Sequence, residues 1–151
     1  MKEQPIYQRI LVAVDGSDLS DRALREAIAL AKSQCAALRI VHVADEVTLN
    51  WEGEYVDMAD VLEKFRESGR RVAEKAQGLV RGAGLEAEVK LLEIQSFGQR
   101  ISDMIVAESK DWPADLIVVG THGRRGLHDM LLGSVADGIA RRATVPVLLV
   151  R

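Results

Sequence analysis

Apolar residues are grouped into five short runs along the chain, and the segments between these runs show helical spacing. The runs occupy residues 10–14, 38–43, 86–91, 116–119 and 147–150. Helical spacing is found over residues 19–33, 57–81 and 99–109, and a short fourth helix is predicted to start at residues 133–134. Runs of strand type that alternate with helices are typical of an α/β fold with a mostly parallel sheet.

The same pattern indicates where each strand lies in the sheet. Residues 10–14 are apolar without interruption, as in a central strand that helices cover on both faces. Residues 86–91 alternate between charged and apolar side chains, which predicts an edge strand. With right-handed crossovers, these positions predict a single doubly wound domain over residues 1–151, with five parallel strands in the order 3-2-1-4-5 and four helices. Ligands bind such sheets where the strand order reverses, and Asp15 and Gly120 stand at the two strand ends concerned.

The composition of the chain argues against some classes of binding partner. The net charge of -3 and the sequence pI near 5.6 argue against a general nucleic-acid or membrane-surface binder, which usually carries a basic excess. No stretch approaches the length of a membrane-spanning apolar segment, and the first residues lack an apolar signal region. The one cysteine, Cys35, is predicted to be a buried small hydrophobe at the end of the first helix. We therefore expect a cytoplasmic protein that binds neither nucleic acid nor membrane.

Glycines follow the fourth apolar run at positions suited to anion binding. The run ends in Gly120, and the spacing continues as Gly120-x2-Gly123-x9-Gly133-Ser134, with the last pair at the head of a helix. Glycines let a backbone approach an anion closely, and the first N–H groups of a helix have no partner within the helix. The helix dipole adds roughly 0.3–1 kcal/mol in favour of negative charge at an exposed helix start. The spacing therefore predicts a phosphate-binding loop.

This spacing resembles the nucleotide-binding signature of the universal stress protein family. The chain also resembles the family at residues 10–17, an apolar strand that ends in Asp-Gly-Ser, and at residues 145–150, a closing Val-Pro-Val strand. The middle of the chain matches only in its rhythm of strands and helices. The resemblance implies ATP as the ligand, Mg²⁺ beside it, and the strand order given above.

The resemblance also implies roles for individual residues. Gly133, Ser134 and Val135 would hold the terminal phosphates, and Gly120 and Gly123 complete the glycine signature. At the other end of the ligand, the family places the end of strand one against the base and reads adenine with the backbone at the end of strand two. The corresponding residues are Val14, Asp15 and Val43, and Asp15 would also lie near a bound Mg²⁺.

Several candidates have an ordinary structural interpretation as well. Ser134 could be a helix N-cap, and Asp15 could be a turn acid that accepts from nearby backbone N–H groups. Arg124 could neutralise phosphate or be solvated. The other candidates are assigned to packing or to the surface: His42 in the core or lining the crevice, His122 and His128 on the surface, and Trp51 and Trp112 in packing.

The leading functional prediction is a binding protein that responds to ATP occupancy. A slow ATPase, or a protein that phosphorylates itself on Ser134 or Thr121, ranks lower because the chain has no Walker-type Gly-Lys-Ser/Thr sequence. A binder of AMP or cyclic AMP and a nucleotide-free interaction module are further alternatives. Val147–Val150 is an apolar edge strand, and the family's dimers join through it, so we predict a homodimer.

Overall fold

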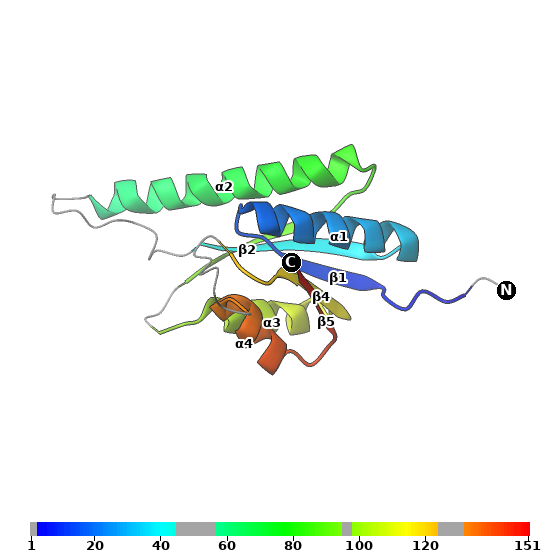
Figure 1. The fold of residues 1–151 in the computed structure, drawn as a ribbon. Coiled ribbons are helices and arrows are strands. Elements are labelled where there is room, and N and C mark those ends of the chain that lie inside the picture. The colour runs from blue at the N-terminus through cyan, green and yellow to red at the C-terminus, as the bar shows by residue number, and fades with distance from the viewer. Residues whose placement is uncertain (1–2, 45–56, 95–97, 124–131) are drawn as a thin grey trace.

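The computed structural model describes residues 3–44, 57–94, 98–123 and 132–151. All five strands are parallel and pair in the predicted order β3-β2-β1-β4-β5 (Figure 1). The elements are β1 (Arg9–Ala13), α1 (Asp18–Gln34), β2 (Ala37–Ala44), α2 (Met58–Gly82), β3 (Glu88–Glu93), α3 (Ile101–Asp111), β4 (Leu116–Gly120), α4 (Ser134–Arg142) and β5 (Val147–Val150).

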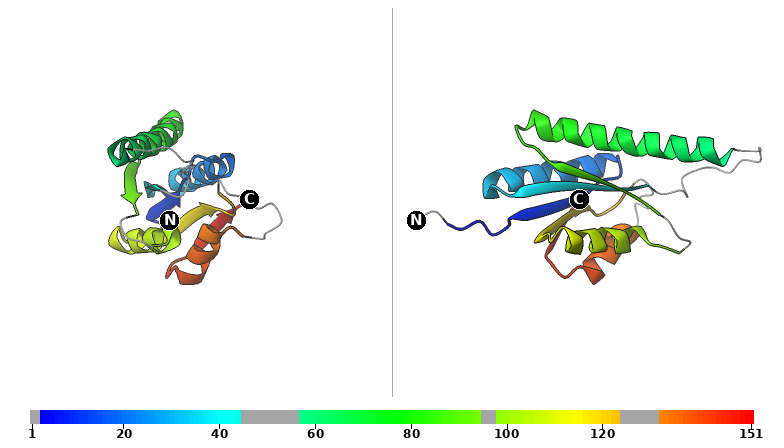
Figure 2. Two further views of the ribbon diagram at one scale, coloured as in Figure 1. Left: turned by 90° about the vertical axis from the view of Figure 1, so that its left-hand side faces the viewer. Right: turned by 180° about the vertical axis from the view of Figure 1, so that it is seen from behind.

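The helices cover both faces of the sheet. Helices α1 and α2 lie on one face and α3 and α4 on the other (Figures 1 and 2). In β1, Ile10 and Val12 face the first pair of helices, while Leu11 and Ala13 face the second pair. The uninterrupted apolar run in β1 follows from this burial on both sides. None of the described helices is both long and apolar enough to span a bilayer.

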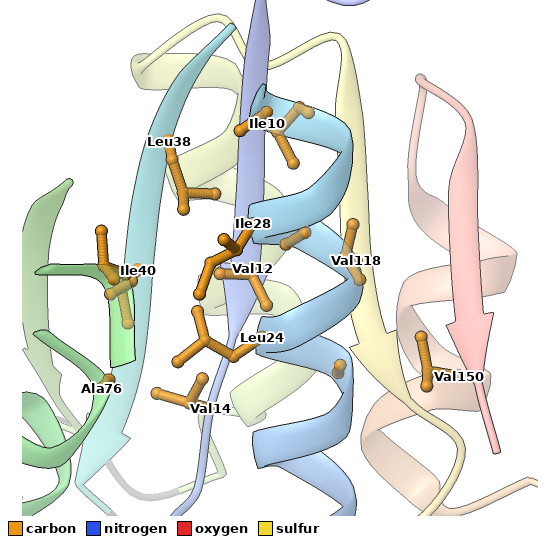
Figure 3. Close-up of a cluster of buried hydrophobic side chains, with 14 of the residues drawn as sticks. Ile10, Val12, Val14, Leu24, Ile28, Leu38, Ile40, Ala76, Val118 and Val150 are labelled. Carbon is orange, nitrogen blue, oxygen red and sulfur yellow. The ribbon is translucent and has the colours of Figure 1, made fainter. Parts of the chain in front are cut away.

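Helix α1 packs closely against the centre of the sheet. Ala23, Ala27 and Ala31 are almost completely buried, and these small side chains let the helix lie near the strands. Figure 3 shows Leu24 and Ile28 beside this stripe, together with core side chains from β1, β2 and β4. Burying a side chain of this size is worth about 1.5–3 kcal/mol. The core thus fixes α1, and with it the loop that joins β1 to α1.

Strand β3 is confirmed as an edge, but it lies two residues later than predicted. It spans Glu88–Glu93 instead of residues 86–91, and its register pairs Arg39 with Glu88. The alternation still places Val89 against the α1 and α2 side. Leu91 lies on the same side by alternation, but it is 43% exposed and lines an open groove between β3 and α2.

The predicted burial of Cys35 is wrong. Cys35 is exposed and is the C-cap of α1, with a left-handed backbone at φ 53°. Its backbone N–H donates to the carbonyl of Lys32 at 3.4 Å. Because the chain leaves the helical conformation here, Cys35 does not continue the buried face that ends at Ala31.

Charged side chains close the amino end of the sheet beside β2. Arg39 donates to Glu108 Oε1 at 2.6 Å and to Glu88 Oε2 at 3.1 Å, and its guanidinium carbon lies 4.8 Å from the centre of the Trp112 ring. Burial alone would lower the pKa of Arg39, but hydrogen bonds and charges from Glu88 and Glu108 outweigh it and raise the pKa above its ordinary value. Trp112 is therefore a packing residue, as predicted.

Asp115 closes the same end of the sheet beside β1 and β4. Its Oδ2 accepts from the backbone N–H of Gln8 at 2.7 Å, and its Oδ1 accepts from that of Arg9 at 3.0 Å. Hydrogen bonds to a carboxylate are stronger than those between neutral groups. Asp115 therefore fixes the entry of the chain into β1.

Candidate functional site

The loops that follow β1 and β4 meet at the carboxyl edge of the sheet. These strands are paired neighbours, and the strand order reverses between them. A Cβ built on Gly123 would lie 3.5 Å from Asp15 Cγ and would overlap Asp15 Oδ2. The carboxylate of one loop thus contacts the backbone of the other. Only glycine fits at position 123 without a shift of Asp15.

A small network of hydrogen bonds orients Asp15. Its Oδ1 accepts from the backbone N–H of Ser17 at 2.9 Å, which is the turn role predicted for this acid. Ser17 also caps α1, because its Oγ accepts from the N–H of Ser20 at 3.2 Å. The Asp15 N–H in turn donates to Ser20 Oγ at 3.3 Å. Asp15 therefore belongs to the ordered start of α1.

The end of β4 packs directly against the start of α1. A Cβ on Gly120 would lie 3.2 Å from Leu19 Cγ, which is tighter than ordinary contact. The next residue, Thr121, is buried and donates its N–H to the carbonyl of Val150 at 2.8 Å. Its Oγ1 lies 3.1 Å from His122 Nδ1. His122 was expected on the surface but is only half exposed.

Gly133 joins the head of α4 to the loop after β4. Its N–H donates to the carbonyl of Thr121 at 2.6 Å, and a Cβ there would lie 3.1 Å from that oxygen and 3.4 Å from His122 Cα. Gly133 is itself the N-cap of α4, and Ser134 is the exposed first residue of the helix. The predicted N-cap role of Ser134 is therefore wrong. The cap lies so near the loop backbone that glycine occupies it.

The first turn of α4 has the properties of an anion site. The intrahelical ladder begins with the Asp137 N–H, which donates to the Gly133 carbonyl at 2.9 Å. Amides of a first turn have no partner within the helix, and the helix dipole is positive at this end. Ser134 and Val135 carry such amides, and a Cβ on the preceding Gly133 would lie 4.0 Å from the Gly123 nitrogen. A phosphate group has the charge and the acceptors that this arrangement suits.

Val14 and Val43 bring their backbones, not their side chains, to this edge. The side chain of Val14 is buried on the α1 and α2 side, and that of Val43 on the opposite face. The N–H of Val14 donates to the carbonyl of Val41 at 2.9 Å, and the carbonyl of Val14 lies 2.8 Å from Nδ1 of buried His42. His42 thus lies in the core, as predicted. A ligand at either valine would meet main-chain atoms.

Several predicted residues lie outside the described part of the chain. These are Arg124, His128 and Trp51. The phosphate-neutralising role of Arg124 therefore stays a prediction. Within the described ranges, no group of three or more His, Cys, Asp or Glu side chains could hold a metal ion. A metal near Asp15 would need ligands from a bound molecule.

The glycine spacing pointed to loops that the structure brings together, but it gave no sign of the residues that support them. Ser17 and Ser20 orient Asp15, His42 holds the carbonyl of Val14, and the Thr121 carbonyl anchors the head of α4. The turn sequence Asp-Gly-Ser at residues 15–17 was a signal for Ser17. The contact between His42 and Val14 joins two strands, and no local pattern marks it.

An open parallel sheet whose glycine-containing loops meet where the strand order reverses defines a doubly wound α/β protein. The model of the Universal stress protein family matches residues 6–151. The chain is 33% identical over 155 aligned positions to Universal stress protein YxiE from Bacillus subtilis, covering 97% of this chain and all of the relative. It belongs to the universal stress protein family.

Two similar solved structures contain nucleotides. One is a universal stress protein in complex with cAMP, with 29% identity, a TM-score of 0.71, and coverage of 96% of this chain and 97% of the other. The second is the universal stress protein from Archaeoglobus fulgidus in complex with dAMP, with 28% identity, a TM-score of 0.67, and coverage of 97% and 99%. Some members of the fold family therefore bind adenine nucleotides.

Proposed function

We propose that this protein binds ATP, together with Mg²⁺, at the carboxyl edge between β1 and β4. The observation that carries the proposal is the convergence of Asp15, Gly123 and Gly133, where two loops and a helix start approach one another through backbone atoms. The cAMP and dAMP complexes of its relatives support an adenine nucleotide. The resemblance of the glycine spacing to the family's ATP-binding signature favours ATP among these nucleotides.

The proposed ligand lies with its phosphates toward α4. The amides of Ser134 and Val135 donate to the terminal phosphates, and Gly133 positions them through its own hydrogen bond to the Thr121 carbonyl. Gly120 and Gly123 allow the close packing of the loops that forms the site. Arg124 adds positive charge from the same loop. The base lies toward β1 and β2, where Val14, Asp15 and Val43 end or follow their strands.

Asp15 fits a magnesium ion that arrives with the triphosphate. Mg²⁺ is usually bound through one or two carboxylates, several waters and substrate phosphates, without an all-protein cage. A single oriented carboxylate facing the loop after β4 meets this requirement. The ion would offset the repulsion between Asp15 and the phosphates.

In this proposal the protein is a cytoplasmic regulator that acts as one nucleotide-binding domain. Binding of ATP changes its behaviour toward a protein partner, and no turnover is required. The site offers an ordered acid and a set of amides, which are sufficient for binding.

The direct test is the identity of any nucleotide that copurifies. Freshly purified protein is denatured by heat, and the released small molecules are separated and identified by mass. We expect ATP at about one molecule per chain, and none from Gly133→Val, whose side chain would enter the space near the Thr121 carbonyl. An empty protein that also shows no binding heat with MgATP or MgAMP would overturn the proposal. Incubation of the ATP-loaded protein with Mg²⁺ would reveal any turnover as ADP.

We further propose that two copies associate through β5. This strand is last in the sheet order, so one of its edges has no strand beside it in the described chain. Its inner edge is set by two hydrogen bonds, from the Ile117 N–H to the Pro146 carbonyl at 3.0 Å and from the Thr121 N–H to the Val150 carbonyl at 2.8 Å. In a parallel ladder with this register, the backbone N–H and C=O groups of Val147 and Leu149 point toward the outer edge.

This geometry selects the substitution that tests the dimer. Leu149→Pro removes an outward N–H, whereas a proline at Leu148 would break the ladder to β4. We expect the unsubstituted protein to be a dimer by size-exclusion chromatography with light scattering and Leu149→Pro to be a folded monomer. A Leu149→Pro protein that remains a dimer would exclude this edge as the interface.

A further inference from the structure

Helix α4 contains a glycine in its interior that the nucleotide signature does not explain. Gly138 is the fifth residue of the helix, a position where glycine is less favourable than alanine. A Cβ at Gly138 would lie 2.6 Å from the Cβ of Ser102 and would overlap Ser102 Oγ. Ser102 is buried near the start of α3. The glycine therefore marks the place where α3 and α4 touch.

None of the other helix glycines in the described chain would place a Cβ closer than 3.6 Å to another segment. Gly78 and Gly82 in α2 would place a Cβ in open space, with no atom within 4 Å. Near Gly138, by contrast, Arg142 donates to Asp103 at 2.6 Å and ties the same two helices together. Helices α3 and α4 lie side by side on one face of the sheet in both figures that show the whole fold (Figures 1 and 2).

Two close contacts thus fix the position of α4. At its head, Gly133 approaches Thr121, and in its middle, Gly138 approaches Ser102. These two points are about 7.5 Å apart along the helix axis at the usual rise per residue. A short helix moves as a rigid body, so a displacement at Gly138 is transmitted to the amides at the head.

We propose that Gly138 is a positioning residue for the phosphate end of the nucleotide. The inference rests on the proposed function and adds the helix contact that sets the geometry of the phosphate end. Carbon atoms pack at about 3.5–4.0 Å, so a Cβ at Gly138 would push α3 and α4 apart by about 1 Å. Hydrogen bonds from the head of α4 to phosphate oxygens would then lengthen beyond the normal range. The base end, formed by β1 and β2, would stay in place.

The test is a comparison of MgATP with adenosine in Gly138→Ala. We expect the dissociation constant for MgATP to rise about tenfold, while that for adenosine changes by less than about twofold. Both constants are measured by calorimetric titration. The matched control is Gly78→Ala, which adds the same methyl group to a helix without a contact and should change neither constant.

Substitutions of Ser102 test the same contact from the α3 side. Ser102→Gly in the Gly138→Ala protein removes the atoms that the new Cβ would meet, and it should restore the affinity for MgATP. Ser102→Cys places a larger atom at the contact from the α3 side and should produce the same selective loss with α4 unaltered. This second variant provides the test if Gly138→Ala does not fold.

The outcomes separate this inference from the function on which it rests. If Gly138→Ala binds MgATP as well as the unsubstituted protein, Gly138 has no positioning role and the nucleotide site stands. An equal loss for MgATP and adenosine, or a loss that Ser102→Gly does not recover, also overturns the inference. Failure of the unsubstituted protein to bind any of these ligands would overturn the proposed function and this inference with it.

Discussion

The two ends of the sheet are closed by different means. At the amino end, side chains make the contacts: Arg39 is held between Glu88 and Glu108, and Asp115 accepts two backbone N–H groups. At the carboxyl end, glycine backbones approach one another and the carboxylate of Asp15. The charged groups named at the amino end already have partners within the chain. At the carboxyl end, the first amides of α4 have no acceptor within the helix.

This difference separates stability from binding. A change at the amino end removes interactions that the folded protein makes with itself, so its cost is a loss of folding free energy. A change at the carboxyl end alters the space around backbone amides, so it lowers the affinity for the ligand. Substitutions at each end should therefore affect one property and spare the other.

The largest expected effect is the loss of stability in Glu108→Ala. Glu108 is buried, and its removal takes away one partner of the partly buried Arg39. Breaking such a pair costs about 3 kcal/mol of unfolding free energy. Urea unfolding measures the loss, and the affinity for MgATP should stay within about twofold at a temperature where the variant is folded.

Glu88 supplies the matched control for this variant. It binds the same arginine, but its side chain is 65% exposed, and exposed ion pairs contribute under about 1 kcal/mol. Equal losses in Glu88→Ala and Glu108→Ala would contradict the account. The raised pKa of Arg39 adds no pH dependence near neutrality, because its contribution is complete below the pKa of arginine in the unfolded chain and disappears only as the pH rises through the higher folded value.

An intermediate effect is expected for Gly123→Ala, this time on binding. The new methyl group would displace the carboxylate of Asp15, which the Ser17 N–H holds in place. We predict about a tenfold loss of affinity for MgATP and a loss of unfolding free energy below about 1 kcal/mol. Titration calorimetry and urea unfolding measure the two quantities. Gly82→Ala, which has open space around its Cβ, is the control. An unchanged affinity for MgATP in Gly123→Ala would contradict the prediction, because the two loops would then move apart without loss of binding.

The smallest effect is a gain of stability in Gly78→Ala. The residue is exposed on α2, and no atom would meet its Cβ. Replacing an exposed glycine within a helix by alanine stabilises the folded state by about 0.5–1 kcal/mol. The midpoint of urea unfolding should rise and MgATP affinity should not change. A lower midpoint would mean that this glycine has a contact that the structure does not contain.

Much of the fold could be predicted because burial imposes simple patterns. Residues 10–14 are apolar at every position since β1 is covered on both faces, and the charges of β3 mark an edge. With these two strands assigned, the parallel topology placed Asp15 and Gly120 at the same edge of the sheet. The candidate site could be located by this reasoning together with the glycine spacing.

The remaining features depend on contacts between segments that are distant in sequence. Whether Gly133 or Ser134 caps α4 is decided by how near the Thr121 carbonyl lies, and no helical periodicity reports that distance. Cys35 was misplaced because the end of α1 turns through a left-handed residue that is not glycine. The contact of Gly138 with Ser102 requires the crossing of two helices, and only an unexpected glycine hints at it.

The central claim is that the carboxyl edge holds the nucleotide, and backbone amide NMR during a MgATP titration tests its location. Glycine amides are spread through the molecule and serve as reporters. The account predicts that the amide signals of Gly120, Gly123 and Gly133 shift together with those of Asp15 and Ser134, while Gly78 and Gly82 stay unchanged. Shifts that concentrate at the amino end around Arg39, or none at a saturating concentration of MgATP, would contradict it.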